Sequence, residues 1–551
     1  MNPKLDFERA KVLIVDDQRA FQVTLKGMLL NLGMKDIQFV ESSDAAIRAC
    51  RAKAFDIVLA DYNLGHGKNG RQLLDTLREK RLLAPHTIFF IISGEATRGV
   101  VLGALEREPD DYMVKPFSLR QLSSRLQRAA TKHQEMREVF SALHNDDIDL
   151  AIETCESLLK ASSRYSSICI KILAEQHRLA GNLDTSEKLL RDILESRDIL
   201  WARVSLGHTL NKASRHNEVL DLLGPVMKQN PLVVEAQDCL AEAYQAMDEG
   251  DKALRILRNA TTISPFTSER QLKLANLARR QEEYLIAQEA FKQVFDLSQR
   301  AIEKNTEHMC NYVRATIEAA LDTSDEQLAK RLETEVFNTL MRARQDAQYN
   351  GFDFQNYEDL VNAHKYASRG DLLRAKKLYY KATERYDNKS EETELPFDFL
   401  NESLNTVALI GELEEAQKLL NKAKESDTVN PFLLSTVVAH SDASTGVEAL
   451  NTQFQVHSRQ GMKAYDEAQY GKAIEEFEVA LQVAPTNTGA ALNLAQTLLK
   501  NLAEQKKPSK AQIKRCEELF RLVDKVRLPS QHRNRRKDLW QQLQQIQQGG
   551  R

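Results

Sequence analysis

Acidic, hydroxyl and amino side chains end several apolar runs in the first 118 residues. They are Asp16 and Asp17 after "VLIV", Asp61 after "IVLA", Ser93 after "IFFII" and Lys115 after "YMV". Carboxylates packed together are costly unless a cation joins them, and hard oxygen ligands with open positions suit Mg²⁺. With Mg²⁺ and Lys115 neutralising phosphoryl oxygens, Asp61 could attack phosphorus in line. These residue types point to phosphoryl transfer onto a carboxylate.

Each of these residues also has an ordinary structural explanation when it is taken singly. Asp16 and Asp17 are then an acid pair at a strand end, Asp61 is a loop-start or capping aspartate, and Lys115 before Pro116 starts a loop. Their order at the ends of successive apolar runs is what favours a functional site.

The elements that must position these groups alternate between strand-like and helix-like patterns. Strand-like runs occupy residues 11–17, 36–42, 56–61, 87–93 and 111–116. Amphipathic helical stretches such as 19–33, which ends on Gly33, lie between them. This alternation predicts a doubly wound α/β domain with a five-stranded parallel sheet over residues 1–118. In such a sheet, functional groups gather outside the carboxyl ends of the strands.

The chain beyond residue 118 is predicted to be all helix. A helix should begin at a cap, Ser118, and continue without a break to about residue 140, as part of a helical connector over 119–148. The regular repeats are expected over 149–298, an irregular helical segment over 299–362, and further repeats over 363–485. C-terminal helices with a basic and Gln-rich cap should fill 486–551.

A repeat of small and large residues supports this division. Its sets are Ala151/Cys155/Leu158, Ser186/Leu190/Ile193, Val219/Leu223/Val226, Ala253/Leu257/Ala260 and Ala287/Phe291/Val294, with later copies at Ala375/Tyr379/Ala382, Ala416/Leu420/Ala423 and Ala473/Phe477/Ala480. The first members of the first five sets are 35, 33, 34 and 34 positions apart, and Pro231 and Pro265 are also separated by 34. This period predicts a solenoid of helix pairs.

Composition excludes several classes of protein. A formal net charge of −3 disfavours a protein whose main partner is nucleic acid or an anionic membrane. The longest apolar run, residues 87–92, is far shorter than the ~20 residues that a membrane span needs. The charged N-terminus lacks the apolar core of a signal peptide, so a cytoplasmic protein without membrane insertion is expected. Six scattered cysteines and twelve dispersed histidines predict reduced thiols and no transition-metal site.

Four segments of the first domain carry a resemblance to a known family. They are "VLIVDD" (12–17), "VLADYNL" (58–64), "IISGE" (91–95) and "YMVKPF" (112–117). The arrangement resembles the receiver domain of bacterial response regulators, which has the CheY-like fold. The resemblance implies that Asp61 accepts a phosphoryl group from a histidine kinase or phosphotransfer protein in a two-component pathway, with Mg²⁺ as cofactor.

The resemblance also implies a role for each neighbour of Asp61. Asp17 would be the principal metal ligand, supported by Asp16, Asp61 and the backbone carbonyl of Asn63. Ser93 would hydrogen-bond the phosphoryl group, Lys115 would pair with it, and Tyr112 would be the switch aromatic. The alternative for Tyr112 is a half-buried strand aromatic. The chain departs from the family in having Leu64-Gly65 after the acceptor, where Met-Pro is usual, and in a slightly longer glycine-rich loop before Gly70.

The segment "GMKAYDEAQYGKAIEEFEVALQVAP" (461–485) resembles the tetratricopeptide repeat (TPR). Its matching residues are Gly461, Ala464, Tyr470, Ala473, Phe477, Ala480 and Pro485. TPR solenoids bind other proteins in a groove, and no DNA-binding or catalytic output motif is evident in this chain. The tail 527–548 is interpreted as a capping helix, with a nucleic-acid contact as the less favoured alternative.

Three functional hypotheses follow from these patterns. In the leading one, phosphorylation of Asp61 changes how the receiver docks on the solenoid, through the face made by its fourth helix, fifth strand and fifth helix, and so gates protein binding. The second is a constitutive scaffold or phosphate sink that modulates a kinase. The third, an enzyme within 298–362, has little support, because acids such as Glu326, Glu333 and Glu335 are interpreted as solvated helix positions. No catalysis is expected beyond the receiver's own aspartyl phosphorylation and dephosphorylation.

Overall fold

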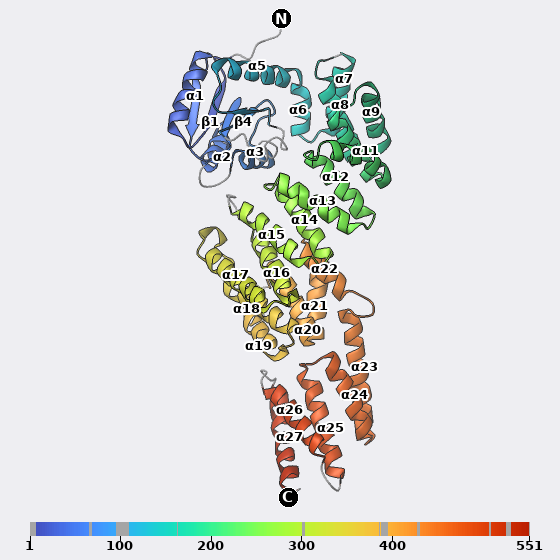
Figure 1. The fold of residues 1–551 in the computed structure, drawn as a ribbon. Coiled ribbons are helices and arrows are strands. Elements are labelled where there is room, and N and C mark those ends of the chain that lie inside the picture. The colour runs from blue at the N-terminus through green and yellow to red at the C-terminus, as the bar shows by residue number, and fades with distance from the viewer. Residues whose placement is uncertain are drawn as a thin grey trace. The chain divides into compact units, whose positions relative to one another are not determined.

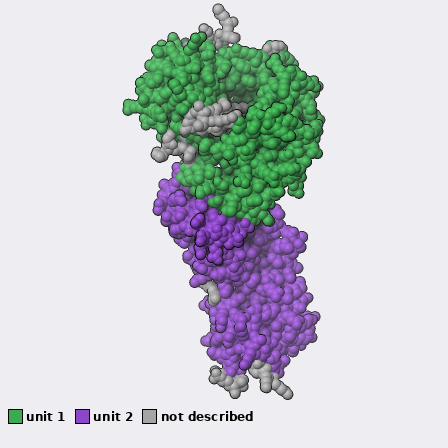
Figure 2. Space-filling model, viewed as in Figure 1, with its two compact units in different colours: residues 1–304 green, residues 305–551 purple. Residues whose placement is uncertain are grey.

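The chain folds as two compact units, residues 1–304 and residues 305–551 (Figure 2). The computed structural model describes residues 7–64, 69–94, 109–161, 163–299, 304–384, 386, 395–426, 430–505, 509–524 and 530–549 (Figure 1). Gly65, Glu95 and the start of the C-terminal tail at 527–529 lie outside these described residues.

The first unit begins with a five-stranded sheet. Its strands are β1 (Lys11–Val15), β2 (Asp36–Val40), β3 (Ile57–Asp61), β4 (Ile88–Ser93) and β5 (Asp111–Val114). They are parallel and lie in the order β2-β1-β3-β4-β5. Strands buried on both faces are continuous apolar runs, which explains why β1, β3 and β4 were evident in the sequence.

Helices cover both faces of this sheet (Figure 1). They are α1 (Arg19–Asn31), α2 (Ser43–Ala52), α3 (Gly70–Glu79) and α5 (Leu119–Glu135). Leu73 and Leu77 of α3 pack with Ile47 of α2 on one face, and Leu25 of α1 packs with Leu126 of α5 on the other. The predicted doubly wound α/β fold is confirmed.

The helix that leaves the sheet is interrupted, contrary to the prediction of a continuous helix to residue 140. Ser118 caps α5 as expected, because its hydroxyl accepts a hydrogen bond from the backbone amide of Gln121. However, α5 ends at Glu135, and α6 (Arg137–His144) begins after Met136, whose ψ is 16°. Met136 is fully buried against residues of α7 and α8, so its packing fixes the change of direction.

Antiparallel helix pairs complete the first unit. The helices are α7 (Ile148–Lys160), α8 (Ser166–Leu179), α9 (Leu183–Ser196), α10 (Leu200–Lys212), α11 (His216–Gln229), α12 (Val234–Ala246), α13 (Gly250–Ile263), α14 (Ser268–Arg280) and α15 (Tyr284–Ser298). The five regular residue sets lie on α7, α9, α11, α13 and α15, with their first two members buried. Of these helices, α7, α9, α11 and α13 each pack against the helix before and the helix after, and α15 packs against α14.

One turn geometry recurs before the second helix of each pair. In the described part of the chain, a residue with φ between +56° and +84° lies five positions before the first member of every set: Asp146, Gly181, Ser214, Asp248, Glu282, Gly370, Gly411 and Ala468. The next residue donates its amide to the carbonyl five positions earlier, at 2.8–2.9 Å. This is the Schellman ending of a helix. The same ending therefore closes the first helix of eight pairs.

The second unit is helical throughout its described residues. Its elements are α16 (Thr306–Asp322), α17 (Glu326–Arg344), η1 (Ala347–Tyr349), α18 (Phe354–Ser368), α19 (Leu372–Thr383), η2 (Phe397–Phe399), α20 (Leu400–Ile410), α21 (Leu413–Lys424), α22 (Pro431–His440), α23 (Val447–Asp466), α24 (Tyr470–Val483), α25 (Thr488–Glu504), α26 (Lys510–Asp524) and α27 (Ser530–Gly549). Leu539 and Leu543 attach α27 to the core formed with α25 and α26.

The irregular segment forms an elongated helix pair, and a buried ion pair joins its first helix, α16, to α20. Helices α16 and α17 have 17 and 19 residues, against 13 to 15 for α7 to α15. The Arg314 guanidinium lies 2.7 Å from the Glu402 carboxylate, and both are buried. Glu326 is exposed as expected, but the two other acids of this segment are not simply solvated. Glu333 pairs with Lys365 at 3.0 Å, and Glu335 accepts a hydrogen bond from a tyrosine hydroxyl.

The predicted fold class is thus confirmed: an α/β domain with a five-stranded parallel sheet precedes a solenoid-like helical region. Within the described residues, no helix is both long and apolar enough to cross a membrane.

Candidate functional site

The predicted site residues follow neighbouring strands and meet at one edge of the sheet. Asp16 follows β1, Asp61 ends β3, Ser93 ends β4 and Lys115 follows β5. Because β1, β3, β4 and β5 are parallel and adjacent, their carboxyl ends share this edge. Asp61 lies opposite Ile92, so its backbone is held inside the ladder between β3 and β4.

Lys115 joins two carboxylates at this edge. Its ammonium nitrogen Nζ lies 2.8 Å from Asp16 Oδ2 and 2.7 Å from Asp61 Oδ1. The side chains of Asp16 and Asp61 are only 2% and 5% exposed, and that of Lys115 is 16% exposed. Lys115 Nζ also lies 3.8 Å from the ring centroid of Phe21, which forms a cation–π contact. One ammonium is therefore shared by two buried carboxylates.

Backbone amides orient the same two carboxylates. The amide of Gln18 donates to Asp16 Oδ1 at 2.8 Å, and the amide of Asn63 donates to Asp61 Oδ2 at 3.0 Å. Burial raises the pKa of the Asp61 carboxyl, although the Lys115 ammonium and the Asn63 amide act to lower it. Each oxygen of Asp61 thus has a defined neighbour, and the group is held in place on a rigid strand.

The start of α3 is packed against the Asp61 backbone. A Cβ atom at position 70 would lie 2.3 Å from the Asp61 carbonyl oxygen, so only glycine fits there. The Gly70 amide donates to the Tyr62 carbonyl at 2.9 Å, and Asn69 caps the helix in a capping box with Gln72. Gly70 and Phe21 were not predicted as site residues. A glycine directly after a capping asparagine was the available signal for Gly70.

The remaining predicted residues differ in exposure. Ser93 is fully buried beside this edge, and Tyr112 lies in the core cluster that also contains Tyr62. Tyr112 is therefore turned toward the interior of the domain. Asp17, the expected principal metal ligand, is exposed, whereas Asp16, the expected supporting ligand, is buried.

The chemistry of the edge fits Mg²⁺ in its donor types. Asp16 and Asp61 offer carboxylate oxygens, which Mg²⁺ prefers. Within the described ranges, no three Asp, Glu, His or Cys side chains are arranged to hold a metal ion. In the arrangement shown, Lys115 supplies the positive charge between Asp16 and Asp61.

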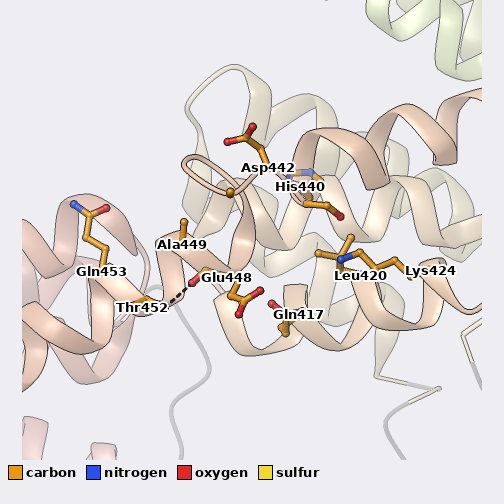
Figure 3. Close-up of a pocket in the computed structure, with 11 residues that line it drawn as sticks. Gln417, Leu420, Lys424, His440, Asp442, Glu448, Ala449, Thr452 and Gln453 are labelled. Carbon is orange, nitrogen blue, oxygen red and sulfur yellow. Dashed lines mark hydrogen bonds between the residues drawn. The ribbon is translucent and has the colours of Figure 1, made fainter.

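A cavity of about 650 Å³ lies in the second unit (Figure 3). Its lining comes from one face of α21 (Gln417, Leu420, Lys424), from the end of α22 and the turn after it (His440, Ser441, Asp442, Ala443), and from α23 (Glu448, Ala449, Thr452, Gln453). The Asp442 carboxylate accepts hydrogen bonds from Ser444 and Thr445, so it shapes the turn. This polar cavity, which we call the second-unit groove, was not predicted.

Comparison with known proteins assigns the first domain. Residues 12–127 match the family described as the response regulator receiver domain. Over 118 residues the chain is 30% identical to the chemotaxis protein CheY-3 of Vibrio cholerae, covering 89% of that protein and 21% of this chain. The chain belongs to the response regulator receiver family.

Two other relatives match part of this chain. It is 34% identical over 121 residues to the response regulator protein FleR of Pseudomonas aeruginosa, covering 22% of this chain and 24% of FleR. It is 25% identical over 254 residues to the sensor protein GacS of Pseudomonas syringae, covering 45% of this chain and 27% of GacS. The chain therefore spans about a quarter of the length of these two relatives.

Solved structures also match the receiver domain. A CheY-like receiver from Methanospirillum hungatei is 21% identical, with a TM-score of 0.21, and the match covers 23% of this chain and 97% of that one. The receiver domain of a sensor histidine kinase from Pseudomonas aeruginosa, with a magnesium ion coordinated in its active site cleft, is 25% identical, with a TM-score of 0.20. That match covers 22% of this chain and 97% of the kinase receiver.

Proposed function

We propose that this protein is a two-component response regulator in which phosphorylation of Asp61 gates protein binding by the helical region. The observation that carries the proposal is the pairing of two buried carboxylates, Asp61 and Asp16, with a single ammonium, Lys115, at the edge of a receiver sheet. This arrangement keeps a carboxylate oriented, and places a cation where phosphoryl oxygens would carry negative charge.

The phosphoryl donor would be a phosphohistidine on a histidine kinase or phosphotransfer protein. An Asp61 carboxylate oxygen attacks phosphorus, the phosphorus–nitrogen bond breaks, and the imidazole leaves and takes up a proton. Lys115 then pairs with the new phosphoryl group, and the Ser93 hydroxyl hydrogen-bonds to it. Tyr112 would follow Ser93 as the switch residue.

Mg²⁺ would be held by Asp17, Asp16, Asp61 and the carbonyl of Asn63, and would neutralise charge on the transferred phosphoryl group. The support for this part is the donor chemistry of the edge. The magnesium ion in the kinase receiver described above belongs to a relative with the same family domain.

The output would be a TPR-like solenoid. Two close helix crossings support this: a Cβ at Gly207 would lie 2.7 Å from Leu223, and a Cβ at Gly461 would lie 2.7 Å from Phe477, and the two residues are 16 positions apart in both cases. The repeated Schellman turn supports the same interpretation over residues 149–298 and 363–485. Helix pairs stacked in this way form grooves that suit protein partners.

Two grooves in the described chain offer binding surfaces. In the first unit, a cavity of about 510 Å³ between α8, α10 and α12 is lined by Trp201, Val204 and Val233 together with Lys171 and Arg178. We call this the first-unit groove. A larger share of the residues that line the second-unit groove is polar. An aromatic side chain among aliphatic and cationic ones is typical of a protein-binding surface.

Intact mass spectrometry after incubation with acetyl phosphate and Mg²⁺ tests the phosphorylation. We expect a gain of one phosphoryl group that Asp61→Asn abolishes. Asp56→Asn is the matched control, because Asp56 precedes the same strand at its opposite end. No gain, under conditions that phosphorylate another receiver, would contradict the proposal.

A pull-down with and without beryllofluoride then tests the gating. Capture of a partner in only one of the two states supports a phosphorylation-gated output. Equal capture in both states would favour a constitutive scaffold or phosphate sink.

A further inference from the structure

Helix α3 of the receiver contacts the helical repeats near both of its ends. At its start, Arg71 Nη2 donates to Thr267 Oγ1 at 3.1 Å, and Thr267 directly precedes α14. Just beyond its end, Arg81 pairs with Asp146, the left-handed residue that precedes α7. The two ends of this helix region therefore contact the turn before α14 and the turn before α7.

The contact at Arg71 is buried, whereas the contact at Arg81 is not. Arg71 is 2% exposed and is among the largest fully buried side chains of the described chain. The side chains of Arg81 and Asp146 are more than half exposed, and ion pairs of that kind add little to stability. Docking of α3 on the repeats therefore depends chiefly on the Arg71 end.

The repeat side of the contact is built to receive Arg71. Thr267 occupies a helix N-cap position, where a threonine hydroxyl usually bonds to the backbone of the next turn, but it makes no such capping bond. Its hydroxyl instead accepts from Arg71 and, at 3.2 Å, from Arg270 Nη1. Arg270 is held by three hydrogen bonds to Asp238 of α12, at 2.9 Å, 3.1 Å and 2.7 Å.

The same helix is connected to the acceptor aspartate. Gly70, the residue before Arg71, packs against the Asp61 carbonyl so closely that no side chain fits. Two successive residues of α3 thus touch Asp61 on one side and the α13–α14 turn on the other. A phosphoryl group on Asp61 would add about −1.5 to −2 charge beside the start of this helix.

We propose that α3 is the output element of the receiver. In the unphosphorylated protein it is docked on the α13–α14 turn through Arg71, and phosphorylation of Asp61 releases this contact and exposes that turn. The trigger in this inference, phosphorylation of Asp61, rests on the proposed function. The docking of α3 through Arg71 does not. In this proposal the signal passes from the receiver to the repeats through α3. The face made by the fourth helix, fifth strand and fifth helix, which was expected to carry the signal, is then not the main path. Residues 95–108 of that face lie outside the described chain.

Hydrogen exchange followed by mass spectrometry on the full chain tests the docking. Arg71→Ala should speed exchange in the peptide 264–271 by about tenfold, because a buried hydrogen bond to a charged group is lost. Thr267→Val, which keeps the shape and removes the acceptor, should act in the same direction. Arg48→Ala, at an exposed arginine on α2, is the matched control and should leave this peptide unchanged. Unchanged exchange at 264–271 in both Arg71→Ala and Thr267→Val would overturn the docking.

Beryllofluoride with Mg²⁺ tests the trigger. In the wild type it should speed exchange at 264–271 several-fold, and in Arg71→Ala it should add nothing further there. Beryllofluoride that changes exchange around Asp61 but not at 264–271 would overturn the proposed route. If beryllofluoride changes exchange nowhere at the sheet edge, the proposed phosphorylation is contradicted. The comparison of Arg71→Ala with Arg48→Ala still decides whether α3 is docked on the repeats.

Discussion

The edge of the receiver sheet and the turns of the repeats depend on their residues in different ways. At the edge, the charged side chain of Lys115 contacts those of Asp16 and Asp61, and no uncharged side chain could form these ion pairs. At the left-handed turn position, the chain uses glycine three times, aspartate twice, and serine, glutamate and alanine once each. The edge depends on residue identity. The turn depends on spacing, because the hydrogen bond that closes it is made by the backbone.

This contrast predicts unequal responses to mutation. A change of charge at the sheet edge should be severe, since it leaves a buried ion without a partner. A change at a turn should cost the local strain of a left-handed residue, and more only where a neighbouring backbone lies close.

The largest effect is expected at Lys115. Lys115→Ala should lower the free energy of unfolding of the receiver by about 3–5 kcal/mol near neutral pH, the usual cost of removing one partner of a buried ion pair. Without the ammonium, the pKa of Asp61 should rise further, so protonation of Asp61 should restore part of the loss as the pH is lowered. Thermal unfolding from about pH 8 to about pH 5 measures both effects.

Lys35→Ala provides the control for this prediction, because Lys35 pairs with Glu8 at 3.7 Å on the exposed surface. The Lys35→Ala substitution should change the free energy of unfolding little at any pH. A Lys115→Ala protein as stable as the wild type would show that the two carboxylates do not need this cation.

A smaller effect is expected at Asp110, where the receiver joins the repeats. Burial would raise the pKa of Asp110, but the hydrogen bond and charge of His133, together with Lys132, lower it to about 2. A carboxyl group whose pKa is lowered in the folded protein stabilises the fold at pH values above its ordinary pKa of 3.8. This stabilisation is lost as the pH falls toward 2. Asp110→Asn should therefore cost about 2 kcal/mol near pH 7, as measured by denaturant unfolding.

The exposed Asp192 of α9 provides a matched substitution, and Asp192→Asn should change stability little. The difference between wild type and Asp110→Asn should shrink as the pH is lowered below about 4. A difference that is constant with pH would mean that the Asp110 charge does not carry the effect.

The smallest effects are expected at the turns. Gly181→Ala should cost about 1 kcal/mol, because only the left-handed backbone opposes the new methyl group, and Glu282→Gly should gain a similar amount. Gly411→Ala should cost more than Gly181→Ala, since its Cβ would lie 2.6 Å from Ala484. Urea unfolding of the full chain gives the comparison.

Gly27→Ala in α1 tests whether these effects arise from the backbone. Gly27 has open space around its Cβ position and lies inside a helix, so the same substitution should stabilise the protein. Equal costs for Gly27→Ala and Gly181→Ala would contradict the turn interpretation.

The sequence was informative where burial or spacing left a pattern. The strands β1, β3 and β4 are buried on both faces, and their apolar runs end at the residues that form the site. The period of about 34 identified the second helix of each pair, because small residues must recur where helices cross. Phosphorylation of Asp61 and the individual roles of its neighbours stay predictions.

Contacts that depend on three-dimensional proximity left no such pattern. The break at Met136 arises from packing against α7 and α8, and the two carboxylates meet at Lys115 only after β1, β3 and β5 have aligned. The docking of Arg71 joins residues that are distant in sequence, and a lone arginine at a helix start gives no hint of its partner. The turn residues were missed for another reason, since five residue types serve at one position.

The contact between Arg71 and Thr267 also sets an order of events during synthesis. The two residues are 196 positions apart. At about 5–20 residues per second, roughly 10–40 s pass between their emergence from the ribosome. All five strands of the receiver are made before Thr267 appears. On the nascent chain, the surface of α3 is therefore accessible to chaperones and proteases until the α13–α14 turn has been synthesised and can cover it.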